Sequence, residues 1–359
     1  MIPLATISDD LPEDDPDSTA SITAPGTLGT SQAPLEVDAE GPPRITVADL
    51  RQVIITGDEL SSLIVPKRPR LLSNWLCRGD LGFVFAPRGV GKTWLSMALP
   101  HAVSCGLPLG EWPAGEEKAS VLYVDGEMPL ELSKERHQRL KHPGGDVAYL
   151  HHDLLFERLE RSLNIAEPLH QKAITSWLME TGRDFLILDN LSCLASGADE
   201  NKALSYEPIS GWLLELRRRK ITVLFVHHAG RQGFMRGSSK REDAASWIIE
   251  LRDAKEEGQA GARFVTHFAK PSRNTAESIP DLLWHFTSES DSDRTTIHCE
   301  LAQESEYETM IRHIGDGVES VSELADLMIK GKGTISKWVK RGCDSGKLRK
   351  KGQSIVLAL

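Results

Sequence analysis

The chain has 359 residues, of which 40% are hydrophobic and 26% charged, and its formal net charge is −10. This composition is that of an ordinary soluble protein, and it excludes a wholly disordered, collagen-like or coiled-coil chain. The length suggests about two domains with a sizeable buried core.

The acidic charge is concentrated at the start of the chain. Residues 1–43 contain nine acidic residues, no Lys or Arg, seven prolines and no aromatic residue. Such a segment cannot bury enough apolar surface to offset its ordering entropy, so we expect it to be disordered. The functional alternative is an acidic mimic of nucleic acid that covers a basic site. Residues 44–359 carry a net charge of only −1, so the overall acidity does not argue against a DNA partner.

The cysteines and the N-terminus indicate the compartment. The five cysteines form no Cys-x-x-Cys pair, which fits a reducing cytosol better than zinc or redox chemistry. The N-terminus has no basic-then-apolar signal pattern. The longest uncharged stretch, Thr93–Gly110, contains two prolines and two glycines, so we interpret it as a buried helix and a loop. We therefore expect a cytoplasmic protein that has no membrane partner.

Residues 44–298 alternate between strand and helix patterns. Helices are predicted over Leu169–Glu180, ended by Gly182, and around Ile209–Leu216, closed by basic residues. Continuous apolar runs are typical of strands buried on both faces of a sheet. The alternation predicts an α/β domain with a mainly parallel central sheet. The expected strands are Leu81–Phe85, Val121–Val124, Val147–Leu150, Phe185–Leu188, Ile221–Val226 and Arg263–Phe268.

A phosphate-binding loop follows the first of these strands. Small residues there let backbone N–H groups surround phosphates, and the helix that follows adds positive potential at its N-terminus. Lys92 is predicted to contact the β- and γ-phosphates of ATP, and Thr93 to bind Mg²⁺. Ala86 occupies a position where this loop usually has Gly, and a positive φ would be costly there. A chance Gly-rich turn is the alternative. The predicted nucleotide-binding residues are Ala86, Pro87, Arg88, Gly89, Val90, Gly91, Lys92 and Thr93.

Carboxylates end two of the predicted strands. Asp189 follows a buried strand, as in a Walker B motif, and would bind Mg²⁺ through water. Glu127 follows another strand, at the edge where ligands bind parallel sheets. A water that attacks a γ-phosphate needs a carboxylate to orient it, and we predict Glu127 for that role. Asp125 is a weaker candidate for a metal ligand, and solvated loop acids are the alternative.

Two histidines end the strand Ile221–Val226. We predict that His228 senses the γ-phosphate, with a packed histidine as the alternative. The loop Ala229–Lys240 is basic and glycine-rich and contains one aromatic residue, so it suits contact with single-stranded DNA through Arg231 and Arg236. A solvated charged loop is nearly as good an explanation.

The pattern changes in residues 303–359. Two helices, a tight turn, a third helix capped by Thr334 and a hairpin follow in the order of a winged helix-turn-helix. The third helix buries Ile335, Trp338 and Val339 and carries basic residues on its opposite side, as a DNA-recognition helix does. The alternative is a protein-docking module with a solvated basic face. The predicted DNA contacts in this module are Lys337, Lys340, Arg341, Lys347, Arg349 and Lys350.

Taken together, residues 71–286 resemble the RecA-fold hexameric ATPases, in particular the RepA-type replicative helicases of plasmids, phages and mobile elements. The resemblance rests on the order and spacing of the phosphate loop, the strand ending at Glu127, the Leu-Asp189-Asn strand, His227-His228-Ala and Arg236-Gly-Ser-Ser239. It implies a homo-oligomeric ring, a hexamer in this family, with ATP between subunits. It also implies that Glu127 is the catalytic base, His228 the γ-phosphate sensor and Ala229–Lys240 a central-channel loop.

In such rings, an arginine from the neighbouring subunit completes the site. Lys270-Pro-Ser-Arg273 resembles the Lys-x-Arg strand of replicative helicases with one extra residue, so we predict Arg273 for that role. The arginine found after the Arg-Gly-Ser-Ser motif in some RepA-type helicases has no counterpart here, where Ser246 lies near that place. A surface charge without a catalytic role is the alternative.

The sequence as a whole predicts an ATP-hydrolysing, ring-forming DNA motor or helicase for the replication of a plasmid, phage or mobile element. Single-stranded DNA would pass through the ring, and the winged helix would bind duplex DNA. A non-helicase, ATP-switched DNA-binding regulator or loader is the main alternative, and a recombinase-like filament protein is a third.

Overall fold

A computed structural model describes residues 45–195, 203–229, 243–288, 293–303, 306–344, 346–352 and 354–358. The predicted disordered segment 1–43 lies outside these residues. The chain divides into two units, Met1–Val65 and Pro66–Leu359. The predicted domain boundaries near residues 43 and 298–303 remain predictions. Within the described ranges, every helix is too short or too polar to cross a bilayer.

The first unit contains two short helices, α1 (Val47–Val53) and α2 (Gly57–Ser62). Each begins with a capping box, in which Thr46 pairs with Asp49 and Thr56 with Glu59. These reciprocal hydrogen bonds satisfy the first N–H groups of each helix and fix where it starts.

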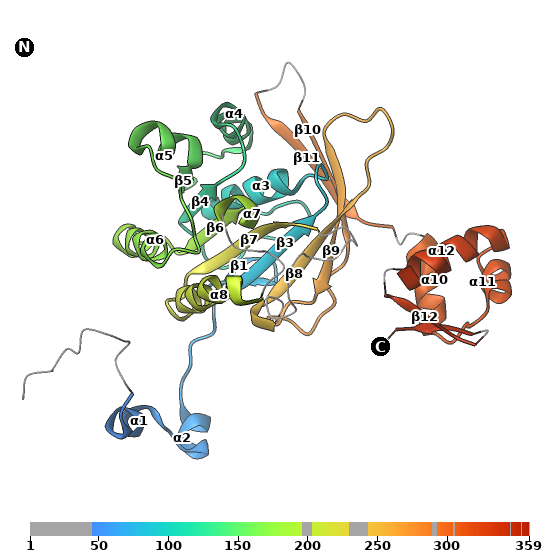
Figure 1. The fold of residues 1–359 in the computed structure, drawn as a ribbon, viewed down its shortest axis with the longest axis horizontal. Coiled ribbons are helices and arrows are strands. Elements are labelled where there is room, and N and C mark those ends of the chain that lie inside the picture. The colour runs from blue at the N-terminus through green and yellow to red at the C-terminus, as the bar shows by residue number, and fades with distance from the viewer. Residues whose placement is uncertain are drawn as a thin grey trace, which may run out of the picture. The chain divides into compact units, whose positions relative to one another are not determined.

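The second unit is built on a nine-stranded sheet in the order β11-β10-β9-β8-β3-β7-β6-β4-β5 (Figure 1). Neighbouring strands from β8 to β5 are parallel, which confirms the predicted mainly parallel α/β core. A separate two-stranded sheet joins β1 (Arg70–Leu72) and β2 (Leu76–Cys77). The parallel strands are β8 (Trp247–Asp253), β3 (Leu81–Ala86), β7 (Thr222–His228), β6 (Phe185–Asp189), β4 (Val121–Asp125) and β5 (Val147–His151).

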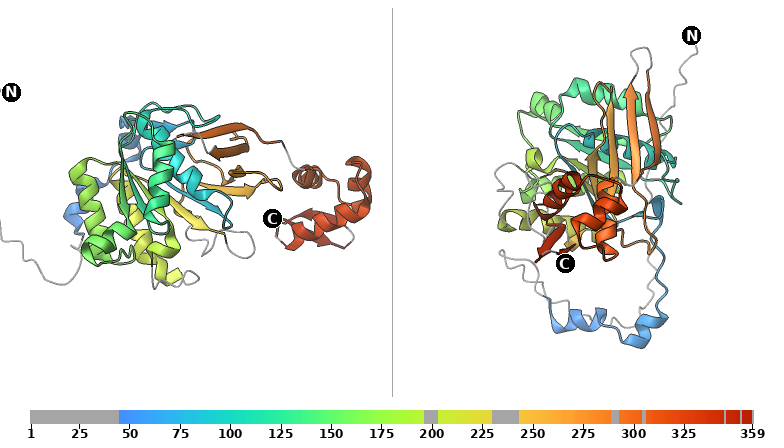
Figure 2. Two further views of the ribbon diagram at one scale, coloured as in Figure 1. Left: turned by 90° about the horizontal axis from the view of Figure 1, so that it is seen from above. Right: turned by 90° about the vertical axis from the view of Figure 1, so that its right-hand side faces the viewer.

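Helices lie on both faces of the sheet (Figures 1 and 2). Apolar residues of α3 (Lys92–Cys105) and the end of α4 (Leu130–Leu140) pack in the core of one face. On the other face, the core contains residues of α6 (Pro168–Thr181), α7 (Leu191–Leu194) and α8 (Ala203–Arg218). Both helices predicted from sequence are present, since α6 ends at Gly182 with a positive φ of 66° and α8 contains Ile209–Leu216. A further helix, α5 (His152–Leu159), directly follows β5.

One predicted strand has a different character from the one we expected. Arg263–Phe268 lies in β9 (Ala262–Lys270), which is antiparallel to β8 and to β10 (Leu282–Ser288). Its residues alternate between buried and half-buried through most of its length, so it is not a strand covered on both faces. The expectation was wrong because the apolar residues of this segment follow a period of two, which fits a strand with one buried face. The sequence reading also missed β8, β10 and β11 (Thr295–Leu301).

The C-terminal elements follow in the predicted order. They are α10 (Glu306–Gly315), α11 (Val321–Leu327), α12 (Lys332–Asp344) and a hairpin of β12 (Leu348–Lys351) and β13 (Ser354–Leu357). Residues of all five elements share a small core of their own. Ser320 caps α11 by accepting the N–H of Glu323. The predicted cap Thr334 is wrong, because α12 begins at Lys332 and Thr334 lies inside it.

Candidate functional site

The order of the strands brings the predicted site residues to one edge of the sheet. Ala86 pairs in register with His228, and Asp125 with Asp189. All four residues stand at the carboxyl ends of parallel strands, so the phosphate loop and the two acidic strand ends open at the same edge. One strand, β7, separates β3 from β6. The site is therefore assembled from residues that are far apart in the sequence.

Two glycines in the phosphate loop are required by the backbone. Gly89 has a φ of 82° and Gly91 a φ of 126°, and residues with side chains rarely adopt such values. A Cβ atom at Gly91 would lie 2.7 Å from the Phe264 ring. By contrast, Ala86 is the last residue of β3 and forms part of the strand ladder. The strain expected from Ala at that position therefore does not arise.

Lys92 is the first residue of α3 and is almost completely buried. Its Nζ donates hydrogen bonds to the carbonyl oxygens of Ala86 (3.0 Å) and Pro87 (2.9 Å). Burial lowers the pKa of the ammonium group, while Asp189 and Glu127 oppose that shift. The ammonium group therefore lies beside the backbone of Ala86 and Pro87, at the start of the loop. The loop residues Pro87, Arg88 and Gly89 are exposed and Val90 is buried.

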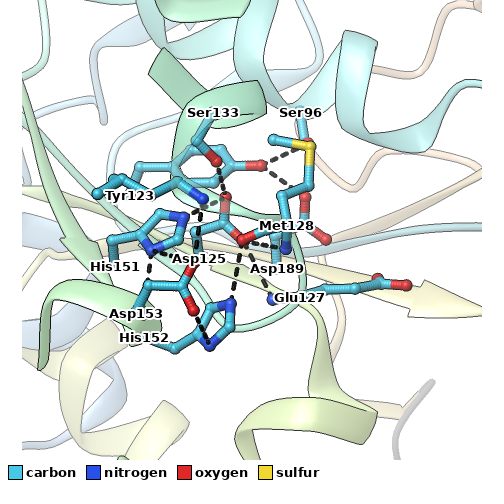
Figure 3. Close-up of polar contacts among 11 residues, drawn as sticks. Ser96, Tyr123, Asp125, Glu127, Met128, Ser133, His151, His152, Asp153 and Asp189 are labelled. Atoms are coloured by element: carbon cyan, nitrogen blue, oxygen red, sulfur yellow. Dashed lines mark hydrogen bonds and ion pairs between the residues drawn. The ribbon is translucent and has the colours of Figure 1, made fainter. Parts of the chain in front are cut away.

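Asp189 is held by two hydroxyl groups that the sequence reading missed. Tyr123 donates a hydrogen bond of 2.5 Å to Asp189 Oδ2, and Ser96 donates one of 3.1 Å to the same atom. Figure 3 shows the three side chains converging. Burial raises the pKa of Asp189 to about 6, although the hydrogen bond from Tyr123 lowers it. The role of Ser96 could have been predicted from its position, because Ser96 lies one helical turn after Lys92 and therefore on the same face of α3.

Asp125 stabilises the turn that follows β4. Its Oδ1 accepts hydrogen bonds from the N–H groups of Glu127 (3.1 Å) and Met128 (3.0 Å), and its Oδ2 accepts one from Ser133 Oγ (2.5 Å). The side chain is buried, and both of its oxygens are used. Asp125 thus fixes the backbone that carries Glu127.

Residues at the junction of β5 and α5 hold the segment that follows Glu127 (Figure 3). His152 Nε2 lies 3.0 Å from the carbonyl oxygen of Met128, and Asp153 Oδ2 accepts a hydrogen bond of 3.0 Å from the N–H of Leu130. His151, His152 and Asp153 are close enough together to hold a metal ion. However, His151 Nδ1 accepts the N–H of Asp153 at 3.1 Å. The hydrogen bonds of these three residues therefore indicate that they stabilise the loop that carries Glu127.

Glu127 and His228 lie side by side at the open edge. The distance from His228 Nε2 to Glu127 Oε2 is 3.6 Å. Asn190, which follows Asp189, donates to Glu127 Oε2 and lies 3.1 Å from His228 Nε2. The structure therefore brings together Lys92, Glu127, Asp189 and His228, and it adds Asn190, which sequence reasoning missed.

Comparisons with known proteins agree with this geometry. The sequence profile of a family described as an AAA domain matches residues 50–233, just over half of the chain. The chain belongs to this AAA domain family. No curated protein matches the chain. With its phosphate loop at the carboxyl edge of a mainly parallel sheet, this AAA domain protein is a P-loop ATPase with a RecA-like core. Such ATPases use a nucleotide and usually Mg²⁺.

Solved structures with a similar fold include two archaeal proteins. A KaiC-like protein from Pyrococcus horikoshii OT3 is 14% identical, with 62% of this chain and 90% of that chain covered and a TM-score of 0.44. The flagellar accessory protein FlaH from Methanocaldococcus jannaschii is 12% identical, with 70% and 98% covered and a TM-score of 0.43.

Arg273 of the AAA domain protein is exposed and lies far from its own phosphate loop. Its guanidinium donates to the carbonyl oxygen of Asp243 (2.7 Å), and its N–H to that of Ser246 (3.0 Å). Ser246 in turn donates to Leu81, at the start of β3. The phosphate loop follows the other end of this six-residue strand, roughly 20 Å away at the rise of a β-strand. Arg273 therefore does not belong to the site of its own chain.

The residues on either side of Arg273 are firmly anchored. Ser272 Oγ donates to the carbonyl oxygen of Trp75 (2.8 Å), and Asn274 Nδ2 donates to the same oxygen (2.7 Å) and to Asp80 Oδ2 (2.6 Å). The fully buried Asp80 also pairs with Arg68 at 2.6 Å. This network anchors the loop of Arg273 to the backbone of Trp75 and to Asp80.

The predicted DNA contacts fall into two groups. Arg231 and Arg236 lie outside the described residues. In the C-terminal elements, Lys337, Lys340, Lys347, Arg349 and Lys350 are exposed. Arg341 is also exposed, but its guanidinium lies 4.7 Å from the centre of the Tyr307 ring, which gives it a packing role inside this module. A groove of about 630 Å³ between α12 and β12 is lined by Ser336, Lys340, Cys343, Leu348, Arg349 and Lys350.

Proposed function

We propose that this P-loop ATPase is a ring-forming DNA motor that serves the replication of a plasmid, phage or mobile element. The observation that carries the proposal is the assembly of Lys92, Asp189, Glu127 and His228 at one sheet edge, together with an exposed basic surface in the C-terminal elements. The first feature supports ATP hydrolysis, and the second supports binding to a polyanion.

Each side chain has a separate task at this edge. Lys92 contacts the β- and γ-phosphates, and the loop N–H groups around Gly89 and Gly91 surround them. Thr93 and Asp189 are the residues that would hold Mg²⁺, which neutralises phosphate charge when it is bound. Both Asp189 hydrogen bonds go to Oδ2, so Oδ1 is the oxygen available to water of the metal shell.

Glu127 acts on the attacking water. Its side chain is 45% exposed and its Oε2 accepts from Asn190, so Oε1 is the oxygen that orients the water and takes its proton. His228 stands beside it and contacts the γ-phosphate. Loss of the γ-phosphate then changes the surroundings of His228, the last residue of β7, and so the segment that follows it.

A second copy of the chain completes the site in this proposal. Arg273 is exposed, anchored through its neighbours and remote from its own phosphate loop. An arginine held in this way suits a site on an adjoining subunit, where it stabilises charge on the transferred phosphoryl group. This arrangement favours a closed ring with ATP between copies, a hexamer by resemblance to the RepA-type helicases.

The C-terminal module would recruit the motor to DNA. Its exposed lysines and arginines lie on α12 and on β12, beside the groove described above. Exposed basic residues on a helix and an adjacent hairpin suit contacts with the phosphates of duplex DNA. Electron microscopy with an ATP analogue and single-stranded DNA tests ring formation, and open filaments would instead favour a recombinase-like protein.

Strand displacement on a forked DNA substrate tests the motor itself. We expect ATP-dependent unwinding by the wild-type protein and none by Lys92→Ala. ATP hydrolysis without unwinding at any protein concentration would refute the helicase function while leaving the ATPase intact.

The second candidate is an ATP-switched DNA-binding regulator or loader. The observation that favours it is the separate core of the C-terminal module, which allows DNA binding without a motor. Under this alternative, deletion of residues 305–359 abolishes binding to a defined duplex site and leaves ATP hydrolysis unchanged. A motor would instead retain binding to single-stranded DNA after the same deletion.

A further inference from the structure

Asn190 occupies the centre of the site and has no role in the mechanism described so far. It directly follows Asp189 and its side chain is fully buried. Its Oδ1 accepts the N–H of Cys193 at 3.2 Å, which caps the short helix α7. The cap fixes the orientation of the amide, because only the oxygen can accept this N–H. The Nδ2 atom therefore faces the open edge of the sheet.

The two N–H bonds of Nδ2 have two partners. One partner is Glu127 Oε2, and the other is His228 Nε2 at 3.1 Å. Since Nδ2 can only donate, His228 Nε2 accepts, and the proton of the neutral imidazole lies on Nδ1. One buried amide thus connects the two side chains that the proposed mechanism assigns to water and to the γ-phosphate.

Glu127 needs such a support more than its neighbours do. Its side chain is 45% exposed, whereas that of His228 is 12% exposed. A partly exposed glutamate samples several rotamers in solution and loses conformational entropy when it is fixed. A hydrogen-bond partner with a fixed orientation restricts the Glu127 side chain before ATP binds, so less entropy is lost during the reaction. A misplacement of about 1 Å in a reacting group can cost about 100-fold in rate.

We propose that Asn190 is a positioning residue that fixes Glu127 and His228 against each other. The proposal rests on the function proposed above, because it assumes that Glu127 orients the attacking water. The capped amide of Asn190 acts as the fixed point, with one hydrogen bond to the catalytic carboxylate and one to the sensor. A movement of His228 at the γ-phosphate therefore reaches Glu127 through a single residue.

Two substitutions separate the bridge from the helix cap. Asn190→Ser and Asn190→Asp both retain an oxygen that can cap α7, and neither can donate two N–H groups. We expect the dissociation constant of a fluorescent ATP analogue to stay within about twofold, and kcat to fall by about tenfold or more. Asn190→Asp, which adds a negative charge beside Glu127, should lose the most activity. The melting temperature should remain close to that of the wild-type protein.

The matched control is Asn164→Ser. Asn164 Oδ1 also accepts a backbone N–H, that of Ala166 at 3.0 Å, and it lies in the loop before α6. This variant should keep the wild-type kcat. If Asn190→Ser also keeps it within twofold, or loses ATP affinity and thermal stability together with kcat, Asn190 has no positioning role.

A double-mutant cycle with Glu127→Gln separates the two levels of the argument. If Asn190 acts through Glu127, the tenfold effect of Asn190→Ser should shrink to about twofold or less in the Glu127→Gln protein. Equal effects in both backgrounds would overturn the inference and leave the role of Glu127 intact. Wild-type hydrolysis by Glu127→Gln alone would instead overturn the proposed base, and the positioning role with it.

Discussion

Tyr123→Phe removes one hydroxyl group from the buried cluster around Asp189. The Tyr123 side chain is fully buried, and its hydroxyl contacts Asp189 Oδ2 at 2.5 Å and Ser96 Oγ at 2.9 Å. Phe preserves the ring and its packing, including the contact with Tyr149 at 5.5 Å between ring centres. The substitution therefore isolates the hydrogen bond to the carboxylate.

The size of the effect depends on whether Asp189 is ionised. Burial raises the pKa of Asp189 to about 6 in the folded protein, above its usual value of 3.8. The folded state therefore binds the proton more readily, and stability falls as pH rises from about 4 to 6. Tyr123 opposes this loss, because its hydrogen bond favours the carboxylate. A hydrogen bond to a charged group contributes about 1.5–3 kcal/mol and a neutral one about 0.5–1.5 kcal/mol.

Thermal unfolding of the metal-free protein at pH 8 and pH 5 measures the difference. We expect Tyr123→Phe to lower the melting temperature by roughly 4–8 °C at pH 8 and roughly 2–4 °C at pH 5. The matched control is Tyr149→Phe, whose hydroxyl lies 3.2 Å from His137 Nδ1 and 3.4 Å from His101 Nε2 and contacts no carboxylate among the described residues. Burial lowers the pKa of both histidines, which favours their neutral form. That variant should lose similar stability at both pH values. A loss for Tyr123→Phe that is equal at both pH values, or larger at pH 5, would refute the reasoning.

Three further predictions concern the loop, a buried histidine and the basic module. Gly91→Ala should lower the free energy of unfolding by about 1–3 kcal/mol and abolish ATP binding, because Gly91 has a φ of 126° and a Cβ there would meet Phe264. A Cβ at Gly89 meets open space, so Gly89→Ala should lower it by only about 1 kcal/mol. Calorimetry and nucleotide titration measure both variants, and a larger loss for Gly89→Ala would contradict this reasoning. Burial lowers the pKa of His101 to about 3, so stability is full above pH 6.5 and declines below it by up to about 1.4 kcal/mol per pH unit. His101→Gln should flatten that decline in urea unfolding between pH 6 and 4, and an unchanged slope would contradict the assignment. Arg349→Glu should weaken duplex binding and reduce the salt dependence by about one unit of slope; equal slopes for both proteins would exclude a phosphate contact.

Local chemistry explains why the site was largely predictable. Asp189 and His228 end strands, whereas Glu127 and Lys92 follow strands by two and six residues, and strand ends in a parallel sheet meet at one edge. Spacing along the chain was therefore enough to place these four residues together. Strain at Ala86 was predicted wrongly, because the sequence does not show where the strand ends and the loop begins.

The remaining features depend on contacts that no local pattern encodes. Asn190 and Tyr123 gain their roles from neighbouring strands, and strand order is a property of the whole fold. The segment Trp247–Asp253 carries Glu250 and Arg252 in its interior, so it does not resemble a continuous apolar strand, although it pairs with β3 at the centre of the sheet. Of the antiparallel strands beyond it, β10 alternates between buried and half-buried residues and β11 between half-buried and exposed ones, so their apolar patterns are weaker.

The ion pair between Arg68 and Asp80 limits how far the chain can be truncated from its N-terminus without destabilising the ATPase core. Asp80 is fully buried, accepts the N–H of Cys77 at 2.9 Å and also receives Asn274, next to Arg273. A shortened protein that began after Arg68 would leave this carboxylate without its cation, at a cost below the about 3–5 kcal/mol of a fully buried pair, because Arg68 is 38% exposed and two other donors remain. It would also loosen the segment that carries Arg273. A truncation just before Pro66 preserves both, so two shortened proteins that differ by only a few residues should differ in the stability of the fold.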